Sequence, residues 1–215
     1  MRSRKHRIVF GSGNKNKYLE LAGMLEPSGV HLLFGPEAVG RKIDIEEKGS
    51  TYTENALLKA RAWADATGLP SIADDSGLEV RVLEWGPGIL SARIAADDSR
   101  CVAWLLEALS GTNDREARFV GSLALIVPGR RAVLVSQGYC RGAITTEPQG
   151  TDGFGYDPVF VPSGYRQTFA RLGQAVKNRL SHRFLAAGGM ARMLIGSSVL
   201  ECEVASNSDN FREVQ

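Results

Sequence analysis

Two adjacent carboxylates, Asp74 and Asp75, follow a short apolar run and precede Ser76 and Gly77. Magnesium ions in proteins take one or two carboxylates and complete their shell with water and phosphate oxygens. Neighbouring residues of a strand point to opposite faces, so the two acids need not share one role. The alternative is an Asx-type turn, because Asp-Asp-Ser-Gly is favourable turn chemistry. The residues alone support both interpretations about equally.

A second segment suited to phosphate is Gly11–Lys17, between a predicted strand and a predicted helix. A glycine turn there exposes backbone N–H groups at a helix N-terminus, which favours phosphate binding. The segment is not a P-loop, because Asn16-Lys17-Tyr18 stands where Gly-Lys-Ser/Thr is required, and this excludes a P-loop kinase or GTPase. An ordinary turn with solvated lysines remains the alternative.

Two later segments could hold a nucleoside. Gly150–Asp157 surrounds two aromatic residues with glycines, and Phe154 could stack on a base. The alternative is a tight loop with Phe154 in the core. Lys177–Arg183 offers several hydrogen-bond donors beside a helix start. Taken alone, that stretch is better interpreted as a solvated basic segment capped by Ser181.

The elements that must position these segments follow from hydrophobic periodicity. Thr51 and Glu54 form a capping box, and Gly68 stands where that helix should stop. Helices are predicted over 14–25, 51–67, 97–109 and 179–195, strands over 8–11, 31–34, 71–74, 78–83, 117–127, 132–139 and 159–161, and loop with a short strand over 35–48. Residues from Ser206 onward are polar and predicted to be disordered. Interleaved helices and strands indicate an α/β protein with a mixed sheet.

Composition narrows the class of protein further. The chain has 215 residues, enough for one domain with a substantial core, and its net charge of +2 is too small to indicate nucleic-acid binding. No apolar run reaches transmembrane length, and no long apolar segment follows the basic start 1–7, so a cytoplasmic location is expected. Three cysteines at wide spacing indicate neither a disulfide framework nor a structural zinc site.

In this order, the segments resemble the Ham1/RdgB family of inosine/xanthosine triphosphate pyrophosphatases. The similarity runs from Ile8 to about Ile195, and the ordered set is far more specific than any one piece. The matching pieces are Ser12–Lys17, Glu54-Asn55-Ala56 through Lys59-Ala60, Ala73–Val80, Gly86-Pro87-Gly88 into Ser91-Ala92-Arg93, Gly153–Pro158, and Lys177-Asn178 into Ser181-His182-Arg183.

The resemblance implies a fold and an assembly. The expected fold is α/β, an elongated mixed β-sheet flanked by helices, with two α/β lobes and a cleft between them. It would form one domain over residues 1–200, followed by a flexible tail over 201–215. The family is usually dimeric, so a homodimer is expected.

The resemblance also implies a role for individual residues. Asp75 matches the general base and a Mg²⁺ ligand, with Asp74 in support. Glu46 matches a second Mg²⁺ ligand, although the adjacent Glu47 leaves the register open. The implied substrate-binding residues are Ser12, Gly13, Asn14, Lys15, Asn16, Lys17 and Lys59 toward the phosphates, Ser76, and Phe154, Gly155, Tyr156, Asp157, Lys177, His182 and Arg183 toward base and sugar.

The implied reaction is hydrolysis of ITP, dITP and XTP to the monophosphate and pyrophosphate, which clears deaminated purines from the nucleotide pool. The expected partner is a nucleoside triphosphate, with neither nucleic acid nor membrane involved. Two alternatives are a nucleotide pyrophosphatase of different base preference and a non-catalytic nucleotide-binding module. Two residues depart from the family pattern: Arg171, where an acid is common, and Trp85, where a small residue is usual.

Overall fold

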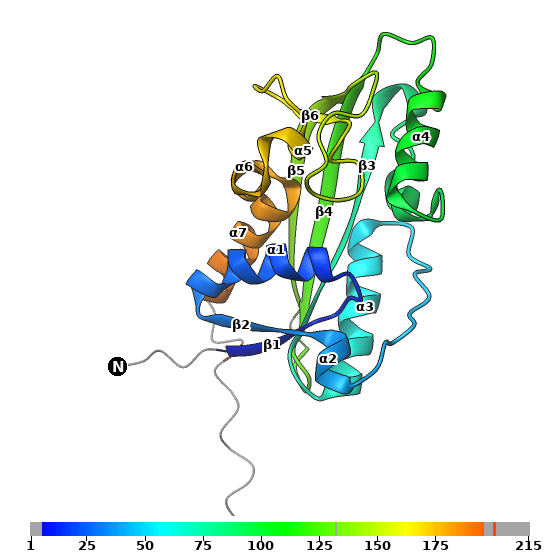
Figure 1. The fold of residues 1–215 in the computed structure, drawn as a ribbon. Coiled ribbons are helices and arrows are strands. Elements are labelled where there is room, and N and C mark those ends of the chain that lie inside the picture. Colours follow the sequence, from blue (N-terminus) through cyan, green and yellow to red (C-terminus); the bar gives the residue numbers. More distant parts are fainter. Residues whose placement is uncertain (1–5, 132, 196–199, 201–215) are drawn as a thin grey trace, which may run out of the picture.

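The structure is a computed structural model that describes residues 6–131, 133–195 and 200. The segments 1–5, 196–199 and 201–215, and with them the predicted tail, lie outside the described residues. A six-stranded sheet runs through the molecule in the order β2-β1-β3-β4-β5-β6 (Figure 1). Its strands are β1 (His6–Phe10), β2 (Val30–Phe34), β3 (Ser71–Val80), β4 (Glu116–Ile126), β5 (Val133–Ile144) and β6 (Phe160–Pro162).

The sheet is mixed, as predicted. Strand β1 pairs in parallel with both β2 and β3, and the remaining neighbours are antiparallel. The ladder between β1 and β3 ends at Phe10 and Ile72. The part of β3 that carries Asp74 and Asp75 is therefore paired on one side only, with β4, and the chain that leaves β1 can pass beside it.

Helices cover the two faces of the sheet unequally. Helices α1 (Lys15–Leu25) and α7 (His182–Ile195) pack together over one face, and α3 (Tyr52–Thr67) packs on β3 and β4 from the other (Figure 1). The other helices are α2 (Gly35–Val39), α4 (Asp98–Ala108), α5 (Phe169–Leu172) and α6 (Gln174–Leu180), with 3₁₀ turns η1 (Glu26–Ser28), η2 (Arg81–Leu83) and η3 (Gly88–Arg93).

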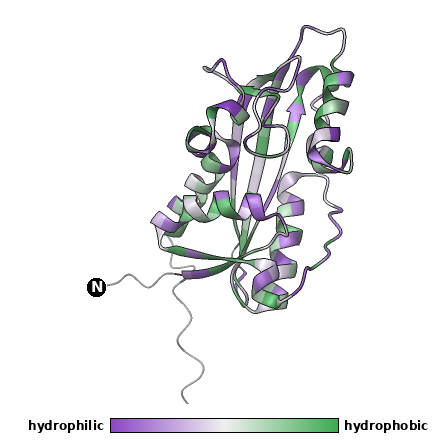
Figure 2. Cartoon of the chain, in the orientation of Figure 1, coloured by the Kyte–Doolittle hydropathy of each residue, from purple (hydrophilic) through white to green (hydrophobic). Residues whose placement is uncertain are grey.

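Two large apolar clusters lie at opposite ends of the sheet. One joins β1, β2, α1 and α7, and includes Phe10, Leu21 and Met190. The other joins α4, β6 and the far ends of β3, β4 and β5, and includes Leu105 and Phe160. Hydrophobic residues follow the strands, whereas hydrophilic residues concentrate on outer helix surfaces and loops (Figure 2). A molecule with two packed ends leaves room for a cleft between them.

Strand β3 overturns one local prediction. The sequence predicted a strand over 71–74, a turn, and a second strand over 78–83, but Ser71–Val80 is one continuous strand. All ten of its residues pair with β4, so the long ladder outweighs the turn preference of Asp-Asp-Ser-Gly. A Cβ on Gly77 would lie 2.1 Å from the carbonyl oxygen of Gly88, so this glycine serves close packing rather than a turn.

Three other predictions are wrong in detail. Residues 35–39 form helix α2 instead of loop and strand, with Gly40 in the left-handed conformation at its end. The single helix predicted over 179–195 breaks at Ser181, whose extended backbone separates α6 from α7. Strand β5 continues to Ile144, beyond the predicted end at residue 139.

The predicted start and end of one helix are confirmed. Helix α3 has both halves of the Thr51–Glu54 capping box, and Gly68 caps its C-terminus in the left-handed conformation. Within the described ranges, none of the helices has the length and apolar character needed to cross a membrane.

Candidate active site

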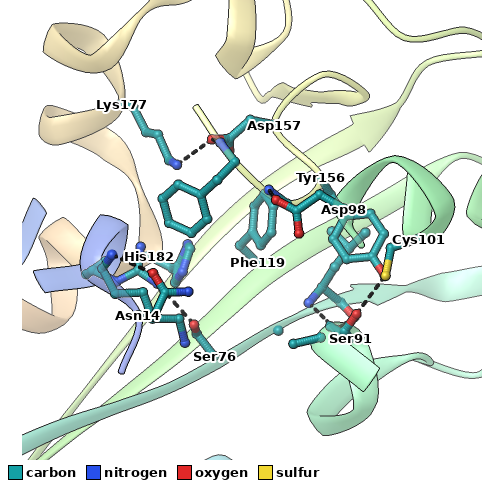
Figure 3. Close-up of a pocket in the computed structure, with 17 residues that line it drawn as sticks. Asn14, Ser76, Ser91, Asp98, Cys101, Phe119, Tyr156, Asp157, Lys177 and His182 are labelled. Carbon is teal, nitrogen blue, oxygen red and sulfur yellow. Dashed lines mark hydrogen bonds and ion pairs between the residues drawn. The ribbon is translucent and has the colours of Figure 1, made fainter. Parts of the chain in front are cut away.

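A pocket opens between the two ends of the sheet, on the face that carries α1 and α7 (Figure 3). Segments far apart in the sequence meet there: the start of α1, the middle of β3, the start of α4, the glycine-rich loop before β6, and the α6–α7 junction. Of the predicted substrate-binding residues, the pocket wall contains Asn14, Lys17, Ser76, Phe154, Gly155, Tyr156, Asp157, Lys177, His182 and Arg183. Most of the predicted set therefore comes together.

Asp74 lies beneath this pocket, fully buried, between two cations. Its Oδ2 is 2.7 Å from Lys17 Nζ and 3.3 Å from Arg183 Nη2, and the Ser76 hydroxyl donates to the same oxygen at 3.0 Å. Burial alone would raise the pKa of Asp74, but Arg183 and Lys17 outweigh it and hold that pKa well below its usual range. Asp74 is thus a permanent anion that orients cations of the pocket.

The loop from Ser12 to Lys17 is shaped by its own side chains. Asn14 caps α1 by accepting the Lys17 N–H at 3.0 Å, and Ser12 Oγ accepts the Asn14 N–H at 3.1 Å. Lys15 instead points to Glu37 and the Phe34 ring. Ser12, Gly13, Lys15 and Asn16 belong to the loop but not to the pocket wall. Asn14 and Lys17 are the loop residues that the structure brings to the pocket.

The glycine-rich loop forms the opposite wall. Asp157 is buried and accepts hydrogen bonds from the Phe154 N–H at 2.9 Å and from Lys177 Nζ at 2.5 Å. Lys177 Nζ lies 4.2 Å from the Phe154 ring centroid. The Gly155 N–H donates to Asp98 at the start of α4, at 2.6 Å. Phe154 is thus held as part of the pocket wall, as the stacking hypothesis requires.

Glu20 is a buried site residue that the sequence analysis missed. It lies one turn after Lys17 on α1, with one carboxylate oxygen 3.0 Å from Lys177 Nζ and the other 2.5 Å from Arg183 Nη1. Burial would raise its pKa, but Arg183 and Lys177 together lower it. An acid on the inward side of α1 was the available signal. Asp98 was missed as well, and nothing in its sequence context distinguishes it from an ordinary helix start.

His182 closes the pocket floor. Its ring stacks on Phe119, with centroids 5.0 Å apart, and Nδ1 is buried with no hydrogen-bond partner among the described residues. A Cβ on Gly121 would lie 2.7 Å from its ring, so glycine is needed for this close approach. Burial, and then Arg183, lower the pKa of His182 well below 6.5. It is therefore a neutral imidazole in the wall of the pocket, with one buried nitrogen that has no partner among the described residues.

Asp75 occupies the opposite face of β3, toward α3. Its Oδ1 is 2.6 Å from Lys59 Nζ, and its Oδ2 accepts from the Asn55 side chain at 3.4 Å. Lys59 Nζ also lies 3.1 Å from Glu47 Oε1, and Arg93 pairs with the other oxygen of Glu47. Burial raises the pKa of Asp75, although Lys59 opposes that shift. Two carboxylates and two cations thus form a second polar cluster.

The start of α3 fixes the loop that carries Glu47. Glu54 accepts the N–H groups of Ser50 and Thr51, at 2.7 and 3.2 Å. The Gly49 N–H donates to Asn55 at 2.8 Å. Glu46, the predicted ligand, instead pairs with Lys48 and its side chain is 76% exposed. The structure therefore brings Glu47, and not Glu46, to Asp75.

The two departures from the family pattern lie away from the pocket. Trp85 has a left-handed backbone with φ of 65°. The guanidinium carbon of Arg118 lies over the indole ring of Trp85, 4.3 Å from the ring centroid. Arg171 is exposed on α5. Neither residue is part of the pocket wall.

Comparisons with known proteins show the family and the fold of the chain. The model of the Ham1 family matches residues 8–193. A dITP/XTP pyrophosphatase of Synechocystis sp. is 40% identical over 82% of this chain and 89% of its own length. The solved HAM1 protein of Coxiella burnetii is 38% identical, with a TM-score of 0.79 over 89% of this chain and 100% of that one. The Ham1 protein of Staphylococcus aureus is 37% identical, with a TM-score of 0.78 over 88% and 98%.

Proposed function

The chain belongs to the Ham1 family, and from that premise we propose that it hydrolyses deaminated purine nucleoside triphosphates, ITP, dITP and XTP, to the monophosphate and pyrophosphate. The observation that carries this proposal is that the aromatic and cationic pocket and the Asp75 cluster lie next to each other, on the two faces of strand β3. The pocket suits a base, and the cluster at Asp75 suits the phosphates. The relatives named dITP/XTP pyrophosphatase support the substrate class.

The donor set at Asp75 fits a magnesium ion. Asp75 and Glu47 converge from β3 and the loop before α3, and a cation already lies between them in the form of Lys59. Among the described residues no cluster of three or more acids, histidines or cysteines could hold a metal. Two carboxylates with substrate oxygens are the arrangement that Mg²⁺ favours. We assign these ligand roles to Asp75 and Glu47, and a bound Mg²⁺ would neutralise charge on the phosphates.

The chain's own residues would perform the remaining steps. Lys17 would bind the triphosphate at the start of α1, where backbone N–H groups also favour anions. Asp75, buried and with a raised pKa, is suited to accept a proton from the water that attacks the α-phosphorus. Asp74 would act indirectly by holding Lys17 and Arg183 in place. The electrostatic stabilisation of spread charge contributes most in such reactions.

Base choice would depend on hydrogen-bond donors in the pocket. Hypoxanthine and xanthine present an oxygen at position 6, whereas adenine presents an amino group. Arg183 and Lys177 are donors on this wall, and a donor left facing another donor costs roughly 1–3 kcal/mol. That penalty disfavours adenine by about tenfold to a hundredfold. Guanine shares the oxygen at position 6, so it must be refused at position 2, by a donor or a tight wall.

The test is a substrate panel of ITP, dITP, XTP, ATP and GTP with Mg²⁺, assayed for pyrophosphate and orthophosphate separately. We expect pyrophosphate and the monophosphate from the first three, well above ATP and GTP. Equal turnover of all five would contradict the base preference. Release of orthophosphate and a diphosphate would contradict the reaction itself.

We further propose that the described part belongs to a single two-lobed domain, that the protein forms a homodimer, and that it acts in the cytoplasm, where its substrates are used. The two apolar clusters at opposite ends of one continuous sheet support the domain assignment. Light scattering after size-exclusion chromatography would test the dimer, since a monomeric mass at micromolar concentration would contradict it.

A further inference from the structure

Lys59 lies where the proposed function requires a divalent cation. Its ammonium nitrogen is 2.6 Å from Asp75 Oδ1 and 3.1 Å from Glu47 Oε1, and the residue is only 8% exposed. The ammonium thus bridges a carboxylate of β3 to a carboxylate of the loop before α3. Without it, two acids would face each other in a poorly solvated place.

The charges of this cluster balance without a metal ion. Asp75 and Glu47 carry two negative charges, and Lys59 and Arg93 carry two positive charges. A divalent cation bound by both carboxylates would lie within a few ångströms of the ammonium. Like charges at that separation repel strongly where water is scarce. Lys59 and the divalent cation therefore compete for the same two carboxylates.

Lys59 has a second destination close by. Lys17 Nζ lies 2.7 Å from Asp74, the chain neighbour of Asp75, so Lys17 and Lys59 flank the same two residues of β3. The lysine stem is flexible, so its ammonium can turn from the carboxylates toward phosphates bound at Lys17. The same side chain can thus serve the protein with and without metal.

We propose that Lys59 is an exchangeable counter-ion: it holds Asp75 and Glu47 together before the divalent cation binds, and the cation displaces it toward the nucleotide phosphates. This inference rests on the proposed function, because it takes from it the metal and the triphosphate. It goes further by giving one residue two successive partners. It also predicts that metal binding adds the Lys59 ammonium to the site that binds the phosphates.

The test compares Lys59→Met with the wild-type protein in two binding measurements without hydrolysable nucleotide. Binding of Mn²⁺ alone, followed by electron paramagnetic resonance, should tighten about fivefold or more, because the competing ammonium is gone. Binding of inorganic tripolyphosphate at saturating Mn²⁺, followed by calorimetry, should weaken. Arg61→Met, an exposed position on the same helix, is the matched control and should change neither.

The proposal requires the two affinities of Lys59→Met to change in opposite directions, with tighter Mn²⁺ binding and weaker tripolyphosphate binding. A purely structural ion pair would weaken both affinities when broken, and a simple phosphate ligand would leave Mn²⁺ binding unchanged. Either result overturns the proposal. If Lys59→Met does not fold, a crystal of the wild-type protein with Mn²⁺ and no nucleotide decides: a Lys59–Asp75 ion pair still intact beside bound Mn²⁺ also overturns it. Absence of ITP turnover with these results intact would count against the proposed activity alone.

Discussion

The two faces of β3 place neighbouring carboxylates in different environments, which shift their pKa values in opposite directions. Asp74 is fully buried between Lys17 and Arg183, which lower its pKa, whereas Asp75 faces Lys59 and has a raised pKa. The first environment fixes a charge permanently, and the second leaves a carboxylate able to exchange partners. Two residues one peptide bond apart therefore contribute differently, Asp74 to the architecture of the pocket and Asp75 to the proposed chemistry. Four predictions test this difference.

The largest expected effect is on turnover, at Asp75. In Asp75→Asn the amide cannot accept a proton from the attacking water, so kcat for ITP should fall by about 10²–10⁴-fold. Pyrophosphate release at saturating Mg²⁺ is the measurement. Asp65→Asn, an exposed acid on α3, is the control. If Asp75→Asn retained near-normal turnover, the proposed base would be wrong.

The next effect is on stability, at Asp74. Asp74→Asn leaves Lys17 and Arg183 without their shared anion, and breaking a buried ion pair from one side costs roughly 3–5 kcal/mol of unfolding free energy. Asp75→Asn should cost less, because Lys59 keeps Glu47 as a partner. Urea denaturation of both variants gives the comparison. Equal losses would show that the two faces are not different.

A smaller effect separates two adjacent acids on the Asp75 face. Glu47→Gln should raise the Mg²⁺ concentration needed for half-maximal activity by about 10–100-fold, the range seen when a partner of a metal site is lost. Glu46→Gln should leave it unchanged, because that side chain is exposed beside Lys48. Magnesium titrations of ITP hydrolysis measure both. The reverse pattern would identify Glu46 as the ligand instead.

The smallest effect is a pH dependence on the Asp74 face. Because the pKa of His182 is well below 6.5 in the folded protein, the unfolded chain binds a proton below pH 6.5 that the native protein does not. The contribution of neutral His182 to the free energy of unfolding is therefore fully present above pH 6.5. On acidification it is lost, by up to about 1.4 kcal/mol per pH unit. His182→Phe should lose this component of the slope between pH 7 and 5, measured by denaturation.

The control for that prediction is His31→Gln, which changes an exposed histidine and should leave the slope as in the wild-type protein. An identical slope in His182→Phe and the wild-type protein would mean that His182 gains its proton at the same pH in the folded protein as in the unfolded chain. It would also remove the neutral imidazole from the proposed base pocket.

Local signals in the sequence predicted what is locally determined. The capping box at Thr51 and the stop at Gly68 are both present, because each depends on residues within a few positions. The continuous strand through Asp74–Gly77 was not predicted, because its ladder is made with a strand some fifty residues later in the chain. Local preference for a turn could not reveal that partner.

The site shows the same limit. The ordered motifs identified most of the pocket residues, but not the pairing of Glu20 with Lys177 and Arg183, which joins residues more than 150 positions apart. The sequence also left the choice between Glu46 and Glu47 open, because it depends on how a loop without regular structure reaches Lys59 and Arg93. Residue type indicated the chemistry, and only the packed structure indicated which neighbour performs it.

The anchoring of Glu47 from the start of α3 bears on how the chain can vary in length. Three backbone N–H groups on the C-terminal side of Glu47 hold this loop against α3. Gly49 donates to the Asn55 side chain, and Ser50 and Thr51 donate to the Glu54 carboxylate. Residues added or removed between 41 and 45 would leave the register of Glu47 intact. Deleting one residue between Glu47 and Thr51 would displace the carboxylate by about 3.5 Å. We therefore expect changes in chain length to be tolerated before Glu47 and not between Glu47 and Thr51.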